Sequence, residues 1–202
     1  MDKIIGIVLL LDELTARKAV RISRKLAGLQ ENPSLVLSRS KRKPALPHIS
    51  MIHMVKPTGR MTELRRALTV AVEPLKGDVS GRFTGMGLRR NWVFWETPQD
   101  LSINRVHFAV LKAMRPFVSK RVTVTWPMNE AQRWMHQLYG YPSCGECFDP
   151  HVTVAVFPPD AIDEKRVREA SVACFWTSPA LAIAEIGPQG RATKILHRIS
   201  LL

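Results

Sequence analysis

Cysteine is scarce in this chain of 202 residues, which has only three. Three cysteines do not make a disulfide framework, so the fold must rest on a hydrophobic core, and we expect a reducing, cytoplasmic location. Acidic residues are also few, at 17 against 30 Lys and Arg, which leaves a formal net charge of +13. Chains this basic commonly meet a polyanion such as nucleic acid.

Long hydrophobic runs are absent as well. The most apolar stretch near the start, 4–11, has charged residues on both sides and is too short to span a bilayer or to form a convincing signal peptide. We therefore expect a buried strand there and no membrane partner. Neither a glycine-rich dinucleotide loop nor a phosphate-binding P-loop occurs, so we expect no nucleotide cofactor.

The positive charge is concentrated before residue 48. Residues 15–47 carry nine basic residues against one acidic residue, whereas residues 128–163 have a net charge of −4. This uneven distribution suggests that an anionic substrate approaches from one side. Two other interpretations of the run 41–44 remain open: a nuclear-import patch, and charge that is simply solvated.

Alternating strand and helix patterns predict an α+β fold with antiparallel or mixed sheets. Several neighbouring strands look joined by hairpins, which argues against a doubly wound parallel sheet. Strands are expected over 3–11, 46–55, 79–88, 91–96, 122–126, 151–157, 181–186 and 194–201. Helices are expected after Asp12, over 61–75, after Asp100 to 117, over 129–139 and from 158 to about 170.

One short pattern occurs twice. The sequence 47–51 reads Pro-His-Ile-Ser-Met, and 150–154 reads Pro-His-Val-Thr-Val, each at the start of a predicted strand. Alternate residues of a strand share a face, so His48 lies beside Ser50 and His151 lies beside Thr153. A single such motif carries little information, but two copies with matching flanks in matching contexts predict one shared site.

The two motifs together suit a phosphodiester. One imidazole can take a proton from the attacking nucleophile, and the other can give a proton to the leaving oxygen. The two hydroxyls can donate hydrogen bonds to phosphate oxygens, and no metal is required. Strand alternation places Ala155 on the histidine face and His53 on the opposite face of its strand, so His53 is left out of the site. The alternative is that both histidines are edge-strand residues bonded to neighbouring backbone.

The paired motifs resemble the 2H phosphoesterase superfamily, in particular its 2′-5′ RNA ligase-like, or RNA 2′,3′-cyclic phosphodiesterase, branch. The segment Phe83–Gly87 followed by Val93-Phe94-Trp95 is similar to the middle hairpin of that family. The resemblance implies that 1–202 is a single bilobal domain with two small antiparallel sheets, outer helices and a central cleft. It also implies cofactor-free hydrolysis of a cyclic phosphate or a 2′-5′ linkage.

The resemblance further implies roles for the four motif residues. His48 and His151 would be catalytic, Ser50 and Thr153 would bind the phosphate, and the family suggests His151 as the base and His48 as the acid. Around them, Arg89, Arg90 and Lys43 are candidates to hold substrate phosphates, and Tyr141 is a candidate to stack on a base. The five tryptophans are expected to pack in the core or between the lobes.

Two other functions stay open at this point. A non-catalytic RNA-binding module on the same fold would bind RNA without turnover. Cys144 and Cys147 would suit a redox protein, a regulatory disulfide or part of a metal site, although they are more simply read as loop cysteines. We expect RNA or a small nucleotide as the partner, no obligate protein partner, no cofactor and no metal.

Overall fold

The computed structural model describes residues 2–28, 33–40, 42, 44–77, 79–158 and 161–202. Over these residues the strands form two four-stranded antiparallel sheets and one two-stranded ribbon. The first sheet has the order β10 (Ala192–Ser200), β9 (Ala180–Ile186), β1 (Ile4–Leu10) and β3 (His48–Val55). The second has the order β2 (Leu35–Val36), β7 (His151–Val156), β6 (Trp92–Glu96) and β5 (Gly85–Arg89), and the ribbon pairs β4 (Ser80–Phe83) with β8 (Cys174–Thr177).

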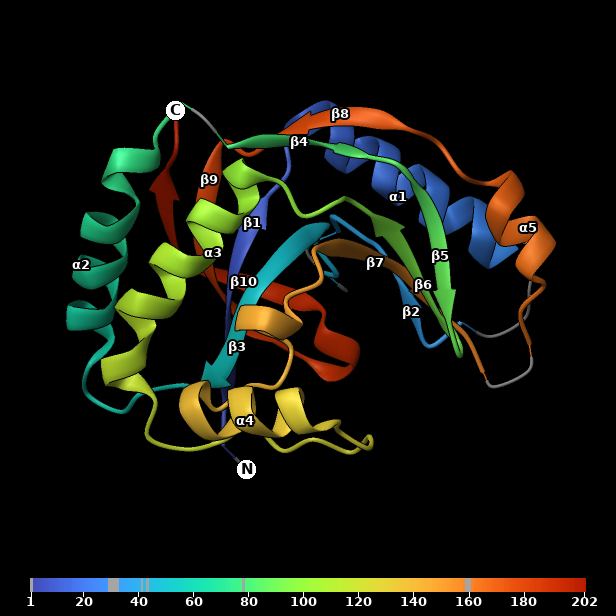
Figure 1. Ribbon diagram of the computed structural model, residues 1–202. Coiled ribbons are helices and arrows are strands. Elements are labelled where there is room, and N and C mark those ends of the chain that lie inside the picture. The colour runs from blue at the N-terminus through green and yellow to red at the C-terminus, as the bar shows by residue number, and fades with distance from the viewer. Residues whose placement is uncertain (1, 29–32, 41, 43, 78, 159–160) are drawn as a thin grey trace.

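The helices divide between two lobes (Figure 1). In the first lobe, α2 (Met61–Val72) packs against α3 (Leu101–Met114), and α3 contacts β3 of the first sheet. In the second lobe, α1 (Glu13–Gly28) packs against β7, and α5 (Glu164–Glu169) packs against β5. A further helix, α4 (Glu130–Tyr139), contacts the loop that leads into β7. None of the described helices has the length and apolarity needed to cross a membrane.

Local sequence signals set several of these boundaries. The Asp100 side chain accepts a hydrogen bond from the backbone N–H of Ile103 and so caps α3. Asn129 and Gln132 form a reciprocal capping box at the start of α4, and Gly140 ends that helix with a φ of 69°, a left-handed conformation that suits glycine. These caps explain why both helices begin close to the predicted residues.

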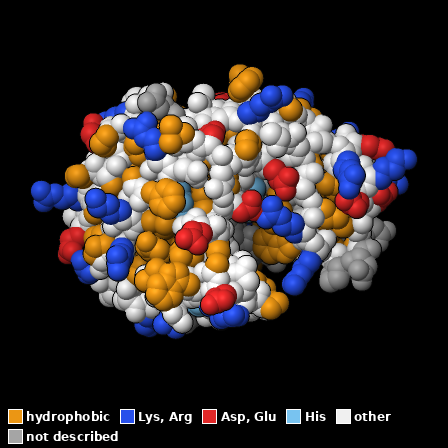
Figure 2. Space-filling view, in the orientation of Figure 1, with side chains coloured by type: hydrophobic (Ala, Val, Ile, Leu, Met, Phe, Trp, Pro, Cys, Tyr) orange, Lys and Arg blue, Asp and Glu red, His pale blue; other side chains and the backbone are white. Residues whose placement is uncertain are grey.

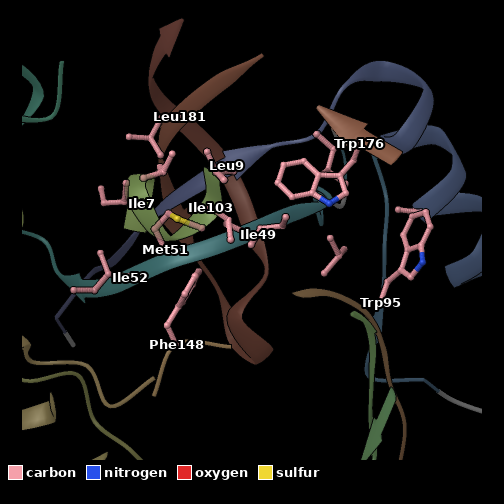
Figure 3. Close-up of a cluster of buried hydrophobic side chains, with 14 of the residues drawn as sticks. Ile7, Leu9, Ile49, Met51, Ile52, Trp95, Ile103, Phe148, Trp176 and Leu181 are labelled. Atoms are coloured by element: carbon pink, nitrogen blue, oxygen red, sulfur yellow. The ribbon is translucent and has the colours of Figure 1, made fainter. Parts of the chain in front are cut away.

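The core lies on the helix-covered sides of the two sheets. In the first lobe, Ile7, Leu9 and Ile49 meet Ile103 of α3 (Figure 3). In the second, the Trp95 ring stacks on Phe83 at 4.1 Å between centroids. Trp95 and Trp176 are buried as predicted, but the core prediction is wrong for Trp126 and Trp134, which are exposed.

The predicted α+β class with antiparallel sheets is confirmed, and the differences are local. No strand forms over 122–126; that segment makes one backbone bond, from Val122 N–H to the Gly140 carbonyl, and no described strand pairs with it. The predicted strand 79–88 is divided at Thr84, because β4 pairs with β8 whereas β5 pairs with β6. α5 is shorter than predicted, and the short strands β2 and β8 were missed.

Candidate active site

The two repeated motifs occupy equivalent positions at the beginnings of β3 and β7. The Nδ1 atom of His48 lies 2.7 Å from the carbonyl oxygen of Leu46, and Nδ1 of His151 lies 2.7 Å from the carbonyl oxygen of Asp149. A carbonyl oxygen can only accept, so Nδ1 carries the proton and donates in both rings. In the neutral form of each ring, Nε2 is therefore the unprotonated nitrogen, the one that can accept a proton.

A β-bulge follows the hydroxyl residue in both motifs. On β3, Ser50 pairs with Val8 and Ile52 pairs with Ile7, so Met51 between them has no partner. On β7, Thr153 pairs with Phe94 and Ala155 pairs with Val93, so Val154 has no partner. The extra residue is the fourth of each motif, counting from the histidine, and it reverses the alternation of faces beyond that point. The two motifs therefore share their backbone geometry as well as their sequence pattern.

The bulge at Met51 corrects the prediction that His53 faces away from the site. His53 pairs with Gly6 and Ser50 pairs with Val8, and opposite residues of an antiparallel pair share a face. His53 consequently lies on the same face as Ser50, and its Nε2 is 3.1 Å from the Ser50 hydroxyl oxygen. Strict period-two counting missed it, because the sequence gives no separate signal for the bulge.

The bulge at Val154 also corrects the position of Ala155. Ala155 pairs with Val93, on the face of β6 that carries buried Trp95, and so belongs to the core face. Val156 pairs with Trp92 and takes the place on the histidine face that His53 holds in the first lobe. The histidine site, as defined by His48, Ser50, His53, His151 and Thr153, is thus symmetric in backbone but not in side chains.

Burial dominates the electrostatics of the first motif. Burial, and to a smaller degree the charge of His151, lowers the pKa of His48, against opposing contributions from the Leu46 and Gly190 backbone. Burial also lowers the pKa of His53 to about 3, with smaller contributions from the charges of His48 and His151. His48 and His53 lie on one face of β3, and β3 contacts β7, which carries His151. Burial keeps the imidazoles of His48 and His53 neutral near neutral pH.

The second motif has a different electrostatic setting. The side chain of His151 is 27% exposed, and its Nδ1 lies 3.6 Å from a carboxylate oxygen of Asp149. Burial opposes ionisation of Asp149, but the nearby His151 ring and the hydrogen bond from Arg89 outweigh it and hold the pKa of the carboxyl below its usual range. Arg89 pairs with Asp149 and also with Glu96, at 3.3 Å. The carboxylate of Asp149 therefore lies beside Nδ1 of His151.

Comparison with known proteins identifies solved structures with a similar fold. No protein-family model and no curated protein matches the sequence significantly. Among solved structures, TT0787 of Thermus thermophilus superposes with a TM-score of 0.64 at 15% identity, covering 98% of this chain and 97% of that one. LigT of E. coli superposes in its complex with NADP+ (TM-score 0.51, 11% identity, 98% and 97% covered) and with 3′-AMP (0.50, 12%, 99% and 98%).

These structures match this chain over nearly its whole length, with TM-scores of 0.50 to 0.64. The chain has the 2H phosphoesterase fold. The sequence identities are only 11–15% over nearly the full length, so these matches show a shared architecture. At the level of the fold, they confirm the resemblance indicated by the paired motifs.

Within the 2H fold, two of the secondary candidates lie at the histidine site. Arg89 pairs with Asp149, which lies beside His151. The guanidinium carbon of Arg89 lies 5.2 Å from the ring centre of Phe94, and the Phe94 and His151 ring centres are 4.2 Å apart. Tyr141 lies 4.9 Å from the His53 ring, centre to centre. Arg90 is exposed in the β5–β6 turn, and Lys43 lies outside the described residues. Figure 2 shows acidic and basic side chains together near the middle of the face between the lobes.

Most of the basic segment lies elsewhere in the 2H fold. The buried face of α1 packs on β7 from the core side, so the exposed Arg17, Arg21 and Arg24 point away from the histidine face. Arg39 pairs with Glu13 at the beginning of α1. The charge on α1 is therefore not an approach to the histidines, which differs from the expectation drawn from sequence. Linear charge density does not reveal on which side of a sheet a helix packs.

The cysteines give no support to a redox or metal role. Burial raises the pKa of Cys144 to about 12, and burial also raises the pKa of Cys147, so the reactive thiolate form is disfavoured at both. The Cys144 thiol donates to the Tyr141 carbonyl at 3.0 Å. Among the residues that the structure describes, no group of three or more His, Cys, Asp or Glu side chains is placed to hold a metal ion.

Proposed function

We propose that this protein is a phosphoesterase that hydrolyses a cyclic phosphodiester, an RNA 2′,3′-cyclic phosphate or a related nucleotide, without a metal. A 2′-5′ linkage offers the same phosphate to the same groups. The observation that carries the proposal is the equivalent geometry of His48 and His151, each with its protonated Nδ1 held by the carbonyl two residues before it. The solved complexes of LigT with NADP+ and 3′-AMP support a nucleotide as the ligand.

The electrostatic difference between the lobes favours one assignment of roles. His48 is buried and has a lowered pKa, so it is neutral and suited to accept a proton. His151 is partly exposed and has the Asp149 carboxylate 3.6 Å from Nδ1, a position that suits the proton donor. This is the reverse of the order that the family resemblance suggests.

The proposed reaction balances with these two groups. His48 Nε2 takes a proton from water as the water oxygen bonds to phosphorus. The bond from phosphorus to one ribose oxygen breaks, and that oxygen receives the proton of His151 Nε2. Ser50 and Thr153 donate hydrogen bonds to the non-bridging oxygens, where negative charge builds up. Proton exchange with solvent then restores both imidazoles.

The test of this function is turnover of the four nucleoside 2′,3′-cyclic monophosphates by the wild-type protein in EDTA. We expect hydrolysis to a nucleoside monophosphate at a rate that EDTA does not change, because both proton transfers use side chains of the chain itself. Loss of turnover in EDTA would point to a metal-dependent reaction. Salt-sensitive RNA binding without turnover of any cyclic or 2′-5′ substrate would favour the RNA-binding module instead.

A second experiment separates the two assignments of acid and base. In Asp149→Asn the ring of His151 loses the carboxylate 3.6 Å from Nδ1, so we expect the alkaline limb of the kcat/KM profile, which reports the proton donor, to move to lower pH. The acid limb, which belongs to His48, should stay in place. The other charged or titratable groups around His151 are Arg89, Glu96 and His53.

The matched control is Glu96→Gln, which also removes a carboxylate partner of Arg89 but leaves Asp149 beside His151. It should move the alkaline limb less than Asp149→Asn does. If Asp149→Asn moves the acid limb and leaves the alkaline limb in place, His151 is the base and the assignment is reversed.

A further inference from the structure

The third imidazole of the site, His53, has a direct contact with the phosphate-binding machinery proposed above. Its Nε2 lies 3.1 Å from the Ser50 hydroxyl oxygen. His53 is 8% exposed, and its ring lies between Tyr141 and β1. A Cβ at Gly6 would come within 3.1 Å of the His53 ring, so glycine at this position lets the imidazole lie against the strand. The neighbours on both sides hold the ring in one orientation.

The hydrogen bond between Ser50 and His53 has two forms. In one, the Ser50 hydroxyl donates to Nε2, and the only proton of the hydroxyl is then turned away from a bound phosphate. In the other, Nε2–H donates to the hydroxyl oxygen, and the hydroxyl proton is free to donate to the phosphate. Because burial lowers the pKa of His53 to about 3, the ring is neutral near neutral pH and has one proton to place. An anion at the site selects the second form, since it accepts hydrogen bonds and cannot donate.

In the second lobe, the phosphate-binding hydroxyl is positioned in a different way. Thr153 has a β-branched side chain, whose methyl group restricts rotation about χ1 and so fixes the hydroxyl. The residue that corresponds to His53 is Val156, which has no polar atom to offer. Ser50 lacks the methyl group and rotates more freely. Ser50 instead has the contact with His53, which limits where its hydroxyl group can point.

We propose that His53 is a positioning residue, which donates from Nε2 to the Ser50 hydroxyl and thereby directs the hydroxyl proton at a phosphate oxygen of the substrate. The proposal rests on the proposed function, because it assigns His53 to the same phosphate site. Consecutive hydrogen bonds, from Nε2–H to the hydroxyl and from the hydroxyl to a phosphate oxygen, also polarise one another, which strengthens the final hydrogen bond. His53 takes no part in the proton transfers of His48 and His151.

The kinetic test uses His53→Phe, which keeps an aromatic ring beside Tyr141 and removes both nitrogens. We expect kcat to fall by roughly tenfold with a smaller change in KM, the size of one lost hydrogen bond that matters in the transition state. In a Ser50→Ala background, His53→Phe should cause no further loss, since its partner is gone. The double variant Ser50→Thr/His53→Phe should return to within about threefold of wild type, because the methyl group again fixes the hydroxyl.

A role limited to packing predicts other results. It predicts that His53→Phe lowers the rate equally in the wild-type and Ser50→Ala backgrounds, and that Ser50→Thr rescues nothing; either result overturns the proposal. The control variant is His197→Phe, the same change on β10 outside the histidine site, which should leave kcat unchanged. Thermal unfolding of each variant shows whether the fold is retained.

A second readout separates this proposal from the proposed function. In protein labelled with ¹⁵N histidine, saturation with inorganic phosphate or a nucleoside 3′-monophosphate should give His53 the nitrogen signals of a ring protonated at Nε2. An unprotonated Nε2 in the bound state overturns the proposal even if the enzyme is active. A protonated Nε2 without any turnover would retain the role of His53 in phosphate binding and remove the proposed hydrolysis.

Discussion

Replacing His48 or His151 with alanine is expected to lower kcat/KM for a nucleoside 2′,3′-cyclic monophosphate by roughly a thousandfold, within the range for loss of a general acid or base. The two variants should differ in pH dependence. His48→Ala should lose the acid limb of the profile, because the group that must be neutral is gone, and His151→Ala should lose the alkaline limb. Since burial lowers the pKa of His48 from its ordinary value of 6.5, we expect the wild-type acid limb below pH 6.5.

The double variant gives the sharper measurement. The effects of removing two groups that act in one transition state are not additive. His48→Ala/His151→Ala should therefore be little slower than the worse single variant. His48 is buried, and a cavity at His48 could unfold the chain, so His48→Gln serves as a second variant that fills most of the space. Full activity in any of these folded variants would rule out the two-histidine mechanism.

The sequence was sufficient for the motifs and insufficient for the bulges inside them. Period-two alternation correctly placed His48 with Ser50 and His151 with Thr153, since these residues precede the unpaired positions. It failed directly after them, where His53 and the alanine at 155 both changed faces. A bulge depends on how many residues the partner strand offers, and neither strand's own sequence records that.

Contacts between distant segments were equally beyond local reasoning. Arg89 and Asp149 are 60 residues apart in the chain, and nothing in either segment indicates that they pair. Its charge makes the arginine a candidate phosphate ligand, whereas in the structure it is already paired with two carboxylates beside His151. Likewise β4 finds its partner in β8, so a strand that looked continuous to Leu88 is divided where the partner changes. Periodicity reports local exposure, and pairing is decided by the whole fold.

Acid is expected to destabilise this protein well above the pH at which carboxylates titrate, and His107 on α3 is a principal cause. Its side chain is fully buried, and its Nε2 accepts a hydrogen bond from the Gly145 backbone N–H at 2.9 Å. The ring stacks on Phe148, with centroids 3.7 Å apart and planes 4° from parallel. A protonated imidazole cannot accept that bond, so His107 must be neutral to hold the loop that leads to His151.

The direction of the change in stability follows from the pKa of His107 in the folded and the unfolded chain. Burial lowers the pKa of His107 to about 4, against a smaller opposing effect of the Met51 backbone, from an ordinary value of 6.5. Between these values the unfolded chain binds more protons than the folded one, so stability is complete above pH 6.5 and falls as the pH drops toward 4. The full loss is about 3 kcal/mol. His53, whose pKa is lowered to about 3, adds a loss of the same sign.

Urea unfolding at pH 7, 6, 5.5 and 5 measures this, since carboxylates at their usual pKa values stay largely ionised over that range. The variant His107→Phe keeps the stack on Phe148 and has nothing to titrate. We expect it to lose roughly 1–3 kcal/mol at pH 7, because the Gly145 N–H loses its acceptor, and to show a smaller fall in stability between pH 6.5 and 5. If its stability falls with pH as steeply as that of the wild type, His107 is not the group responsible, and the comparison with His53→Phe shows whether the third imidazole of the site is.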